Sequence, residues 1–176
     1  MTHPTVVPAF HFRLESPVAS KLEAFTRLSA DDRAALAQVS RNVRFVEPRR
    51  DLMSEGDKPR FVHLVLDGWG CRYKSLPDGK RQIVALFVPG DFCDVNVYIL
   101  KQMDHSIGAI TRLKVAMITP DEMNALTAGR PRITQALWWH ELVTTAIQRE
   151  WTVNLGQRSA YERLGHLLVE LYLRLK

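Results

Sequence analysis

Short β-rich runs separated by turn residues occupy the middle of the chain, and helical patterns lie on both sides of them. Two helices come first, at residues 18–27 and 29–40, and Ser29 is the N-cap of the second. The β-rich runs lie around Val43 and Phe45 and at residues 49–53, 61–66, 71–76 and 82–88. Several short strands at this spacing indicate a sandwich or barrel, and the two helices before them form a small collar.

The strand pattern is interrupted at residues 94–104 and resumes at 106–119, which supplies the closing strands. Ahead of the interruption, the segment Leu76-Pro77-Asp78-Gly79-Lys80 predicts a hairpin, because proline presets one backbone torsion and glycine accepts a positive one. After the closing strands, Pro120 begins a short helix that Gly129 ends. The interruption at residues 94–104 is the part of the barrel that departs most from a regular strand pattern, and it is the most informative about function.

A long helix without proline follows, from Ile133 to about Leu155. One stripe of its residues repeats at alternating steps of four and three, and consists of Ile133, Leu137, His140, Thr144, Ile147, Trp151 and Asn154. A second stripe beside it consists of Ala136, Trp139, Val143, Ala146 and Val153. A helix with two apolar faces needs cover on two sides. We expect its own barrel on one side and the same helix of a second copy on the other, about a twofold axis.

The first stripe supplies the residues predicted for the dimer interface, namely Ile133, Leu137, His140, Thr144, Ile147 and Trp151. Its polar members His140 and Thr144 either fix the register of the pair or form hydrogen bonds within one subunit. The alternative for the whole helix is burial inside a single domain. Gly156 is expected to end the helix, and residues 157–176 form an amphipathic helix whose leucine-rich side needs a partner in further sequence or in another molecule.

Composition and charge narrow the classes of function. A hydrophobic content of 46% suits a packed globular core, and no apolar run approaches the length that spans a bilayer. Residues 1–12 lack a signal pattern, so we expect a cytoplasmic protein without a membrane partner. The net charge of +5 is spread through mixed-charge stretches and by itself does not establish nucleic-acid binding. Cys71 and Cys93 stand apart, and we expect them to be inert, largely buried thiols.

In chain order, the collar, the barrel, the interruption and the two last helices resemble the Crp/Fnr superfamily of bacterial transcription regulators. The most specific motifs are Val88-Pro89-Gly90-Asp91-Phe92, Met103-Asp104-His105-Ser106 and Gly156-Gln157-Arg158-Ser159-Ala160-Tyr161-Glu162-Arg163-Leu164. The resemblance covers residues 25–176. It implies a mixed β and α fold, in which a double-stranded β-helix, a jelly-roll-like β-roll, has an N-terminal helical collar and a long C-terminal dimerisation helix.

The resemblance also implies a domain organisation. Residues 1–17 are expected to be a flexible N-terminus, 18–130 a cyclic-nucleotide-binding-like sensor domain and 131–156 the dimerisation helix. Residues 157–176 are expected to begin a truncated winged helix-turn-helix domain. A homodimer would then bind operator DNA through a C-terminal domain that is not present here, with the angle between the long helices positioning that domain. No base-reading residue is assigned in this chain.

Residues 92–109, here called the cassette segment, correspond in the resemblance to the family's phosphate-binding cassette. There, a glutamate binds the ribose hydroxyl of a cyclic nucleotide, and an arginine followed by serine or threonine binds the phosphate. This chain has Val95 in place of the glutamate and His105 in place of the arginine, and it keeps Ser106. A bidentate cation and a ribose acceptor are thus replaced by a mostly neutral imidazole and an aliphatic group.

Two lost contacts, each worth roughly 1.5–3 kcal/mol, predict that cyclic AMP is not the natural ligand. Val95, His105 and Ser106 mark where another small-molecule effector would bind, and the alternative is that they merely line a relic pocket.

Other chemistry is disfavoured by the residues themselves. An iron–sulfur cluster needs about four thiolates, and a cupin-type metal site needs closely spaced histidines that this sequence lacks. A haem ligand is available among the scattered histidines, but a lone histidine is more often structural. We expect no catalytic residue, no metal ligand, no cofactor and no enzyme activity. The alternative function is a stand-alone dimeric sensor or scaffold that does not bind DNA.

Overall fold

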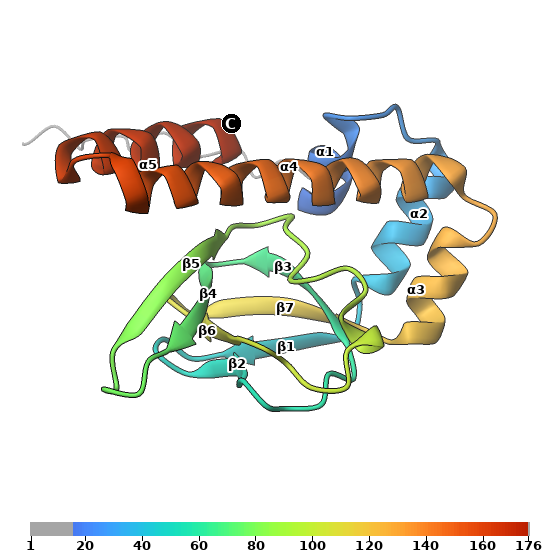
Figure 1. The fold of residues 1–176 in the computed structure, drawn as a ribbon. Helices are drawn as coiled ribbons and strands as arrows, with labels where there is room; N and C mark the ends of the chain where they lie inside the picture. Colours follow the sequence, from blue (N-terminus) through green and yellow to red (C-terminus); the bar gives the residue numbers. More distant parts are fainter. Residues whose placement is uncertain (1–15, 176) are drawn as a thin grey trace, which may run out of the picture.

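The structure is a computed structural model that describes residues 16–175, so most of the predicted flexible N-terminus lies outside the described residues. Within them, seven strands form two antiparallel sheets that close into a roll (Figure 1). One sheet has the order β1–β7–β3 and the other β2–β6–β4–β5. The strands are β1 (Val43–Val46), β2 (Asp51–Met53), β3 (Val62–Asp67), β4 (Gly70–Ser75), β5 (Arg81–Phe87), β6 (Ser106–Ala109) and β7 (Leu113–Ile118). The predicted β-roll with flanking helices is confirmed.

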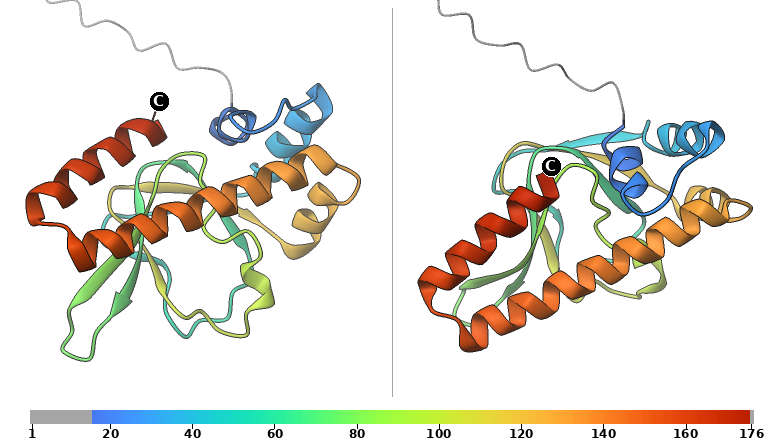
Figure 2. Two further views of the ribbon diagram at one scale, coloured as in Figure 1. Left: turned by 45° about the horizontal axis from the view of Figure 1, so that its top comes forward. Right: turned by 90° about the horizontal axis from the view of Figure 1, so that it is seen from above.

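The helices surround one end and one side of the roll. They are α1 (Pro17–Glu23), α2 (Ala30–Val39), the 3-10 helix η1 (Val97–Ile99), α3 (Pro120–Thr127), α4 (Pro131–Gln157) and α5 (Ala160–Leu175). The collar consists of α1, α2 and α3. Helices α2 and α3 lie at one end of the roll, α1 lies beside α4, and α4 crosses the roll (Figure 1). Figure 2 shows α5 turning back from the end of α4 toward α1. Ser29 begins α2 with a capping box, since its hydroxyl accepts the N–H of Asp32 at 3.1 Å.

A single hydrophobic core joins the collar, the roll and the first half of α4. Its largest fully buried side chains come from all of these parts, and include Leu22, Leu36, Leu64, Met103, Ile107, Leu113, Ile118, Met123, Ile133 and Leu137. Because α4 contributes to this core, its position on the roll is fixed by packing as well as by its connection to α3.

The predicted closing strands at residues 106–119 are found as β6 and β7, and the chain crosses from one sheet to the other between them, at 110–112. One predicted boundary needs correction. Gly156 does not end the long helix, which continues to Gln157 before Arg158 adopts an extended conformation. Among residues 16–175, we find no helix that is both long and apolar enough to cross a membrane.

Candidate functional site

The cassette segment and the turn before it connect β5 to β6. The turn at residues 88–91 is held by Asp91, whose Oδ2 accepts the N–H of Val88 at 2.8 Å. Gly90 has a φ of 92°, and a Cβ there would stand 2.7 Å from the carbonyl oxygen of Pro17. Only glycine allows this approach, so the turn is seated directly against α1.

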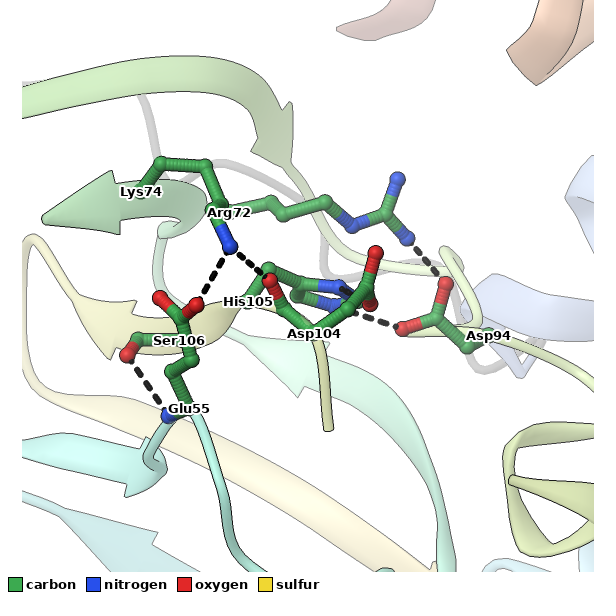
Figure 3. Close-up of polar contacts among 7 residues, drawn as sticks. All are labelled: Glu55, Arg72, Lys74, Asp94, Asp104, His105 and Ser106. Atoms are coloured by element: carbon green, nitrogen blue, oxygen red, sulfur yellow. Dashed lines mark hydrogen bonds and ion pairs between the residues drawn. The ribbon is translucent and has the colours of Figure 1, made fainter. Parts of the chain in front are cut away.

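His105 lies between two carboxylates (Figure 3). Its Nδ1 is 2.7 Å from Asp104 Oδ1, and its Nε2 is 3.1 Å from Asp94 Oδ2. Both contacts are hydrogen bonds only when both ring nitrogens carry a proton, which is the imidazolium form. Both ring nitrogens of His105, the residue in the place of the family's arginine, therefore already contact carboxylates of the protein.

The other two predicted ligand residues are placed differently. Ser106 is buried at the start of β6, and its hydroxyl accepts the backbone N–H of Glu55 at 2.9 Å. Val95 is 6% exposed, and its aliphatic side chain lines the same cavity as His105. The structure thus brings Val95 and His105 together at one cavity, whereas Ser106 holds the loop after β2.

The cavity has a volume of about 590 Å³ and lies between the cassette segment, strands β4 and β5, and helix α4. Its lining residues are Arg72, Lys74, Val84, Asp94, Val95, Asn96, Val97, Leu100, Asp104, His105, Glu141 and Gln148. Cavities of this size accommodate small molecules.

Two basic residues of β4 contribute to the cavity, and both are paired with acidic groups. Arg72 forms an ion pair with Asp94, and Lys74 forms one with Glu55 and also donates to the backbone carbonyl of Asp104 (Figure 3). Neither basic residue was among the predicted site residues. The alternation of a strand, which puts every second residue on one face, was the signal that could have found them together.

Desolvation raises the pKa of Glu141, and the nearby charge of Asp94 acts in the same direction, while Arg72 opposes both. Glu141 comes from α4, so the long helix contributes an acidic group to the cavity. Asp94 has a φ of 93°, a conformation that non-glycine residues rarely adopt. Backbone strain of this kind tends to occur at functional sites.

Two buried histidines and the two thiols lie outside the cavity. Burial lowers the pKa of His63 to about 4, with Arg44 acting in the same direction, and Nδ1 of His63 has no hydrogen-bond partner among residues 16–175. Burial also lowers the pKa of His140. It raises the pKa of Cys71 and raises that of Cys93 well above its usual value. Both cysteines are unpaired and buried, as expected for inert thiols.

The two stripes of α4 are buried to different extents within one subunit. Ile133, Leu137 and His140 are buried against their own subunit, where the His140 ring meets Phe92 edge to face at 6.0 Å. Thr144, Ile147 and Trp151 are half-buried on the same side. The first half of this stripe is therefore buried within one subunit, while Thr144, Ile147 and Trp151 stay partly accessible. The dimer interface itself stays a prediction.

The opposite side of α4 carries large apolar residues that the subunit leaves exposed. This outer α4 face consists of Trp138, Trp139, Leu142, Val143 and Val153, of which Trp138 is 70% and Leu142 59% exposed. It contains most of the second stripe of the sequence. Exposed apolar patches of this kind mark interaction surfaces.

A buried ionic cluster joins α5 to the roll and the collar. Asp91, only 3% exposed, forms ion pairs with Lys21 of α1 and with Arg174 of α5, the latter at 2.6 Å. Arg174 also donates to Glu170 at 2.7 Å, and Glu170 accepts from Trp151 Nε1 at 2.6 Å. Burial alone would raise the pKa of Asp91, but Lys21 and Arg174 outweigh it and lower this pKa.

Much of the leucine-rich side of α5 faces solvent, although Leu167 and Leu171 are half-buried. Its exposed members are Leu164, Leu168, Leu175, Tyr161 and Tyr172. The polar residues His166, Glu170 and Arg174 instead face the rest of the chain, and Asn154 of α4 contacts His166 Nδ1 at 2.9 Å. The expectation that this apolar side lacks a partner within the chain agrees with the exposure of these residues.

Comparisons with known proteins agree with this architecture. Residues 43–130 match the family model described as cyclic nucleotide-binding domain. The chain is 32% identical over 120 residues to the nitrogen fixation regulation protein FixK of Bradyrhizobium diazoefficiens, covering 67% of this chain and 49% of the relative. It is 27% identical over 142 residues to the transcriptional activator protein FnrL of Cereibacter sphaeroides, covering 81% and 56%.

Among solved structures, FixK2 from Bradyrhizobium japonicum superimposes with a TM-score of 0.65 at 21% identity, over 76% of this chain and 66% of that one. This likeness supports the fold. The chain spans about half the length of the curated relatives named above. On the match to the domain model and the agreement in architecture, the chain belongs to the Crp/Fnr superfamily and contains its cyclic nucleotide-binding domain.

Proposed function

We propose that the chain is the effector-sensing and dimerisation portion of a Crp/Fnr-type transcriptional regulator that does not respond to cyclic AMP. Residues 18–130 would form the sensor domain, α4 would pair two subunits, and α5 would begin the DNA-binding part. The observation that carries the proposal is that α4 is apolar on two sides. One side packs on its own roll, and the outer α4 face stays largely exposed, although Trp139 of this face stacks on Phe25 of its own subunit.

Dimerisation through the outer α4 face follows from its chemistry. Two tryptophans, a leucine and two valines exposed along one helix face are costly to leave in water, and burying an exposed leucine contributes roughly 1.5–3 kcal/mol. A twofold axis places the same face of both copies against each other, so one apolar surface covers the other.

The cassette residues support the exclusion of cyclic AMP. Val95 offers no acceptor for a ribose hydroxyl, and His105 is already engaged by Asp94 and Asp104. Arg72 and Lys74 also have acidic partners, so a phosphate would have to break an existing ion pair. The cost of breaking that ion pair adds to the loss of the family's arginine and glutamate contacts.

Titration calorimetry with cyclic AMP tests the exclusion. We expect no binding at micromolar concentrations. A double variant Val95→Glu/His105→Arg, which restores the family's two groups, should bind more tightly than the wild type. Micromolar affinity of the wild type for cyclic AMP would overturn this part of the proposal.

Cysteine cross-linking tests the dimer. Leu142→Cys should form a disulfide-linked dimer under mild oxidation, because a twofold pair brings equivalent positions of the outer α4 face close together. Ala125→Cys on α3 is the control, since it is exposed but lies away from this face. Equal cross-linking of both variants, or of neither, would contradict the proposed interface.

A further inference from the structure

The cavity over the cassette segment has a charge pattern that selects the sign of its ligand. Its permanent cations come from β4, and its carboxylates come from the cassette segment and from α4. Such a mixture could accept either sign in principle. Whether a cation or an anion binds depends on which of these charged groups already form ion pairs within the protein.

Each basic group at the cavity already has an acidic partner. Arg72 is paired with Asp94, and Lys74 is paired with Glu55. His105 contacts Asp94 and Asp104. An anionic ligand would therefore have to displace a carboxylate from its partner, and then remain beside the displaced charge.

Glu141 is the exception among the charged lining residues. Within the described part of the chain, its carboxylate forms no ion pair, and its one hydrogen-bond contact is with the backbone of Val95. It stands near Asp94, another carboxylate, which helps to raise its pKa. Glu141 is also partly open to solvent, so a positive group placed beside it would meet an accessible carboxylate without an ion-pair partner, and would break no existing pair.

The other residues that line the cavity indicate what the rest of the ligand would be. Val84, Val95, Val97 and Leu100 provide an apolar surface for a small hydrocarbon body. Two buried donors that line the cavity, Arg72 Nε and Gln148 Nε2, have no partner within residues 16–175. They would be satisfied by a neutral acceptor such as an amide oxygen.

We propose that this cavity binds a small organic cation, an ammonium or amidinium on an apolar body that also carries a neutral acceptor, with Glu141 as its counter-ion. The inference rests on the proposed function, since it names the effector class of the same sensor site. Because Glu141 belongs to α4, the bound cation would tie the cassette segment to the helix that pairs the subunits. The ligand would thus act directly on the coupling element.

A pair of probes that differ in charge tests the inference. 4-(Aminomethyl)benzamide carries an ammonium and an amide on an aromatic ring, and 4-carbamoylphenylacetate carries a carboxylate in place of the ammonium. In calorimetry at neutral pH, the cation should bind the wild-type protein and the anion should not. Glu141→Gln should weaken binding of the cation by about tenfold or more, as expected for the loss of a charge-assisted contact.

Asp67→Asn is the matched control, because Asp67 is an exposed carboxylate outside the cavity lining. It should leave the affinity for the cation unchanged. The inference is overturned if the cation fails to bind at millimolar concentration, if Glu141→Gln binds it as tightly as the wild type, or if the anion binds equally well. Sedimentation separates the two proposals, since a refuted ligand class leaves the dimer intact, whereas a monomeric wild type refutes the proposed function itself.

Discussion

Replacing Asp91 with asparagine should destabilise the protein strongly. The substitution keeps the size of the side chain and retains an oxygen for the N–H of Val88, but removes the negative charge between Lys21 and Arg174. All three side chains are largely buried, at 4%, 19% and 15% exposure. Two cations would then share a low-dielectric site without their common partner.

Breaking a buried ion pair by removing one member typically costs about 3–5 kcal/mol. Arg174 keeps Glu170 and the carbonyl oxygen of Leu86 as acceptors, so we expect a loss near the lower end, about 3 kcal/mol. For a chain of this size, that corresponds to a fall in Tm of about 6–12 °C. Urea and thermal unfolding followed by circular dichroism measure both quantities.

Glu47→Gln provides the comparison. Glu47 and Arg112 form an ion pair at 3.4 Å whose side chains are 67% and 66% exposed, and pairs of this kind contribute less than about 1 kcal/mol. A loss for Asp91→Asn no larger than that of Glu47→Gln would show that the charge of Asp91 gives no net stabilisation between Lys21 and Arg174.

Two other substitutions probe the buried histidines. The pKa of His63 is lowered from 6.5 to about 4, so the unfolded chain binds a proton in this interval that the folded protein does not. The free energy of unfolding should therefore fall by about 3 kcal/mol as the pH falls from 6.5 to 4. His63→Gln should reduce this pH dependence, measured by urea unfolding at several pH values. An unchanged pH dependence would contradict the lowered pKa of His63. His140 also has a lowered pKa and should leave a residual slope. His140→Leu should leave the sedimentation behaviour unchanged, because His140 packs on Phe92 of its own subunit; a shift toward monomer would place it at the subunit interface instead.

Local features of the sequence were enough to predict most of the fold. The cap at Ser29, the turns between the β-rich runs and the proline that begins α3 each determine structure within a few residues, and all are found. The crossing at residues 110–112 could not be predicted in this way. Strands β6 and β7 are both apolar and adjacent in the chain, and only their pairing with distant strands assigns them to different sheets.

The sequence placed Val95 and His105 in one segment, where they line one cavity, but it did not indicate the contacts of that cavity. Val95 and His105 were found from their places in the cassette segment, yet the partners of His105 include Asp94, eleven positions away in sequence. The sequence assigned the first stripe of α4 to the dimer interface, but both stripes are apolar, and the pattern alone does not say which one packs on the roll. The contact with Phe92 settles which stripe faces the roll. The link between Asp91 and Arg174 joins residues 83 positions apart, and no local pattern indicates it.

Sedimentation equilibrium of the wild-type chain measures whether α4 pairs two subunits, because sensing through α4 requires two copies of that helix. We expect a mass of twice the 20.1 kDa of one chain at micromolar concentration. Leu142→Glu on the outer α4 face should reduce this to the mass of a monomer, and Ala125→Glu on α3 should not. A wild-type mass of 20.1 kDa, or a dimer that tolerates Leu142→Glu, would contradict the account.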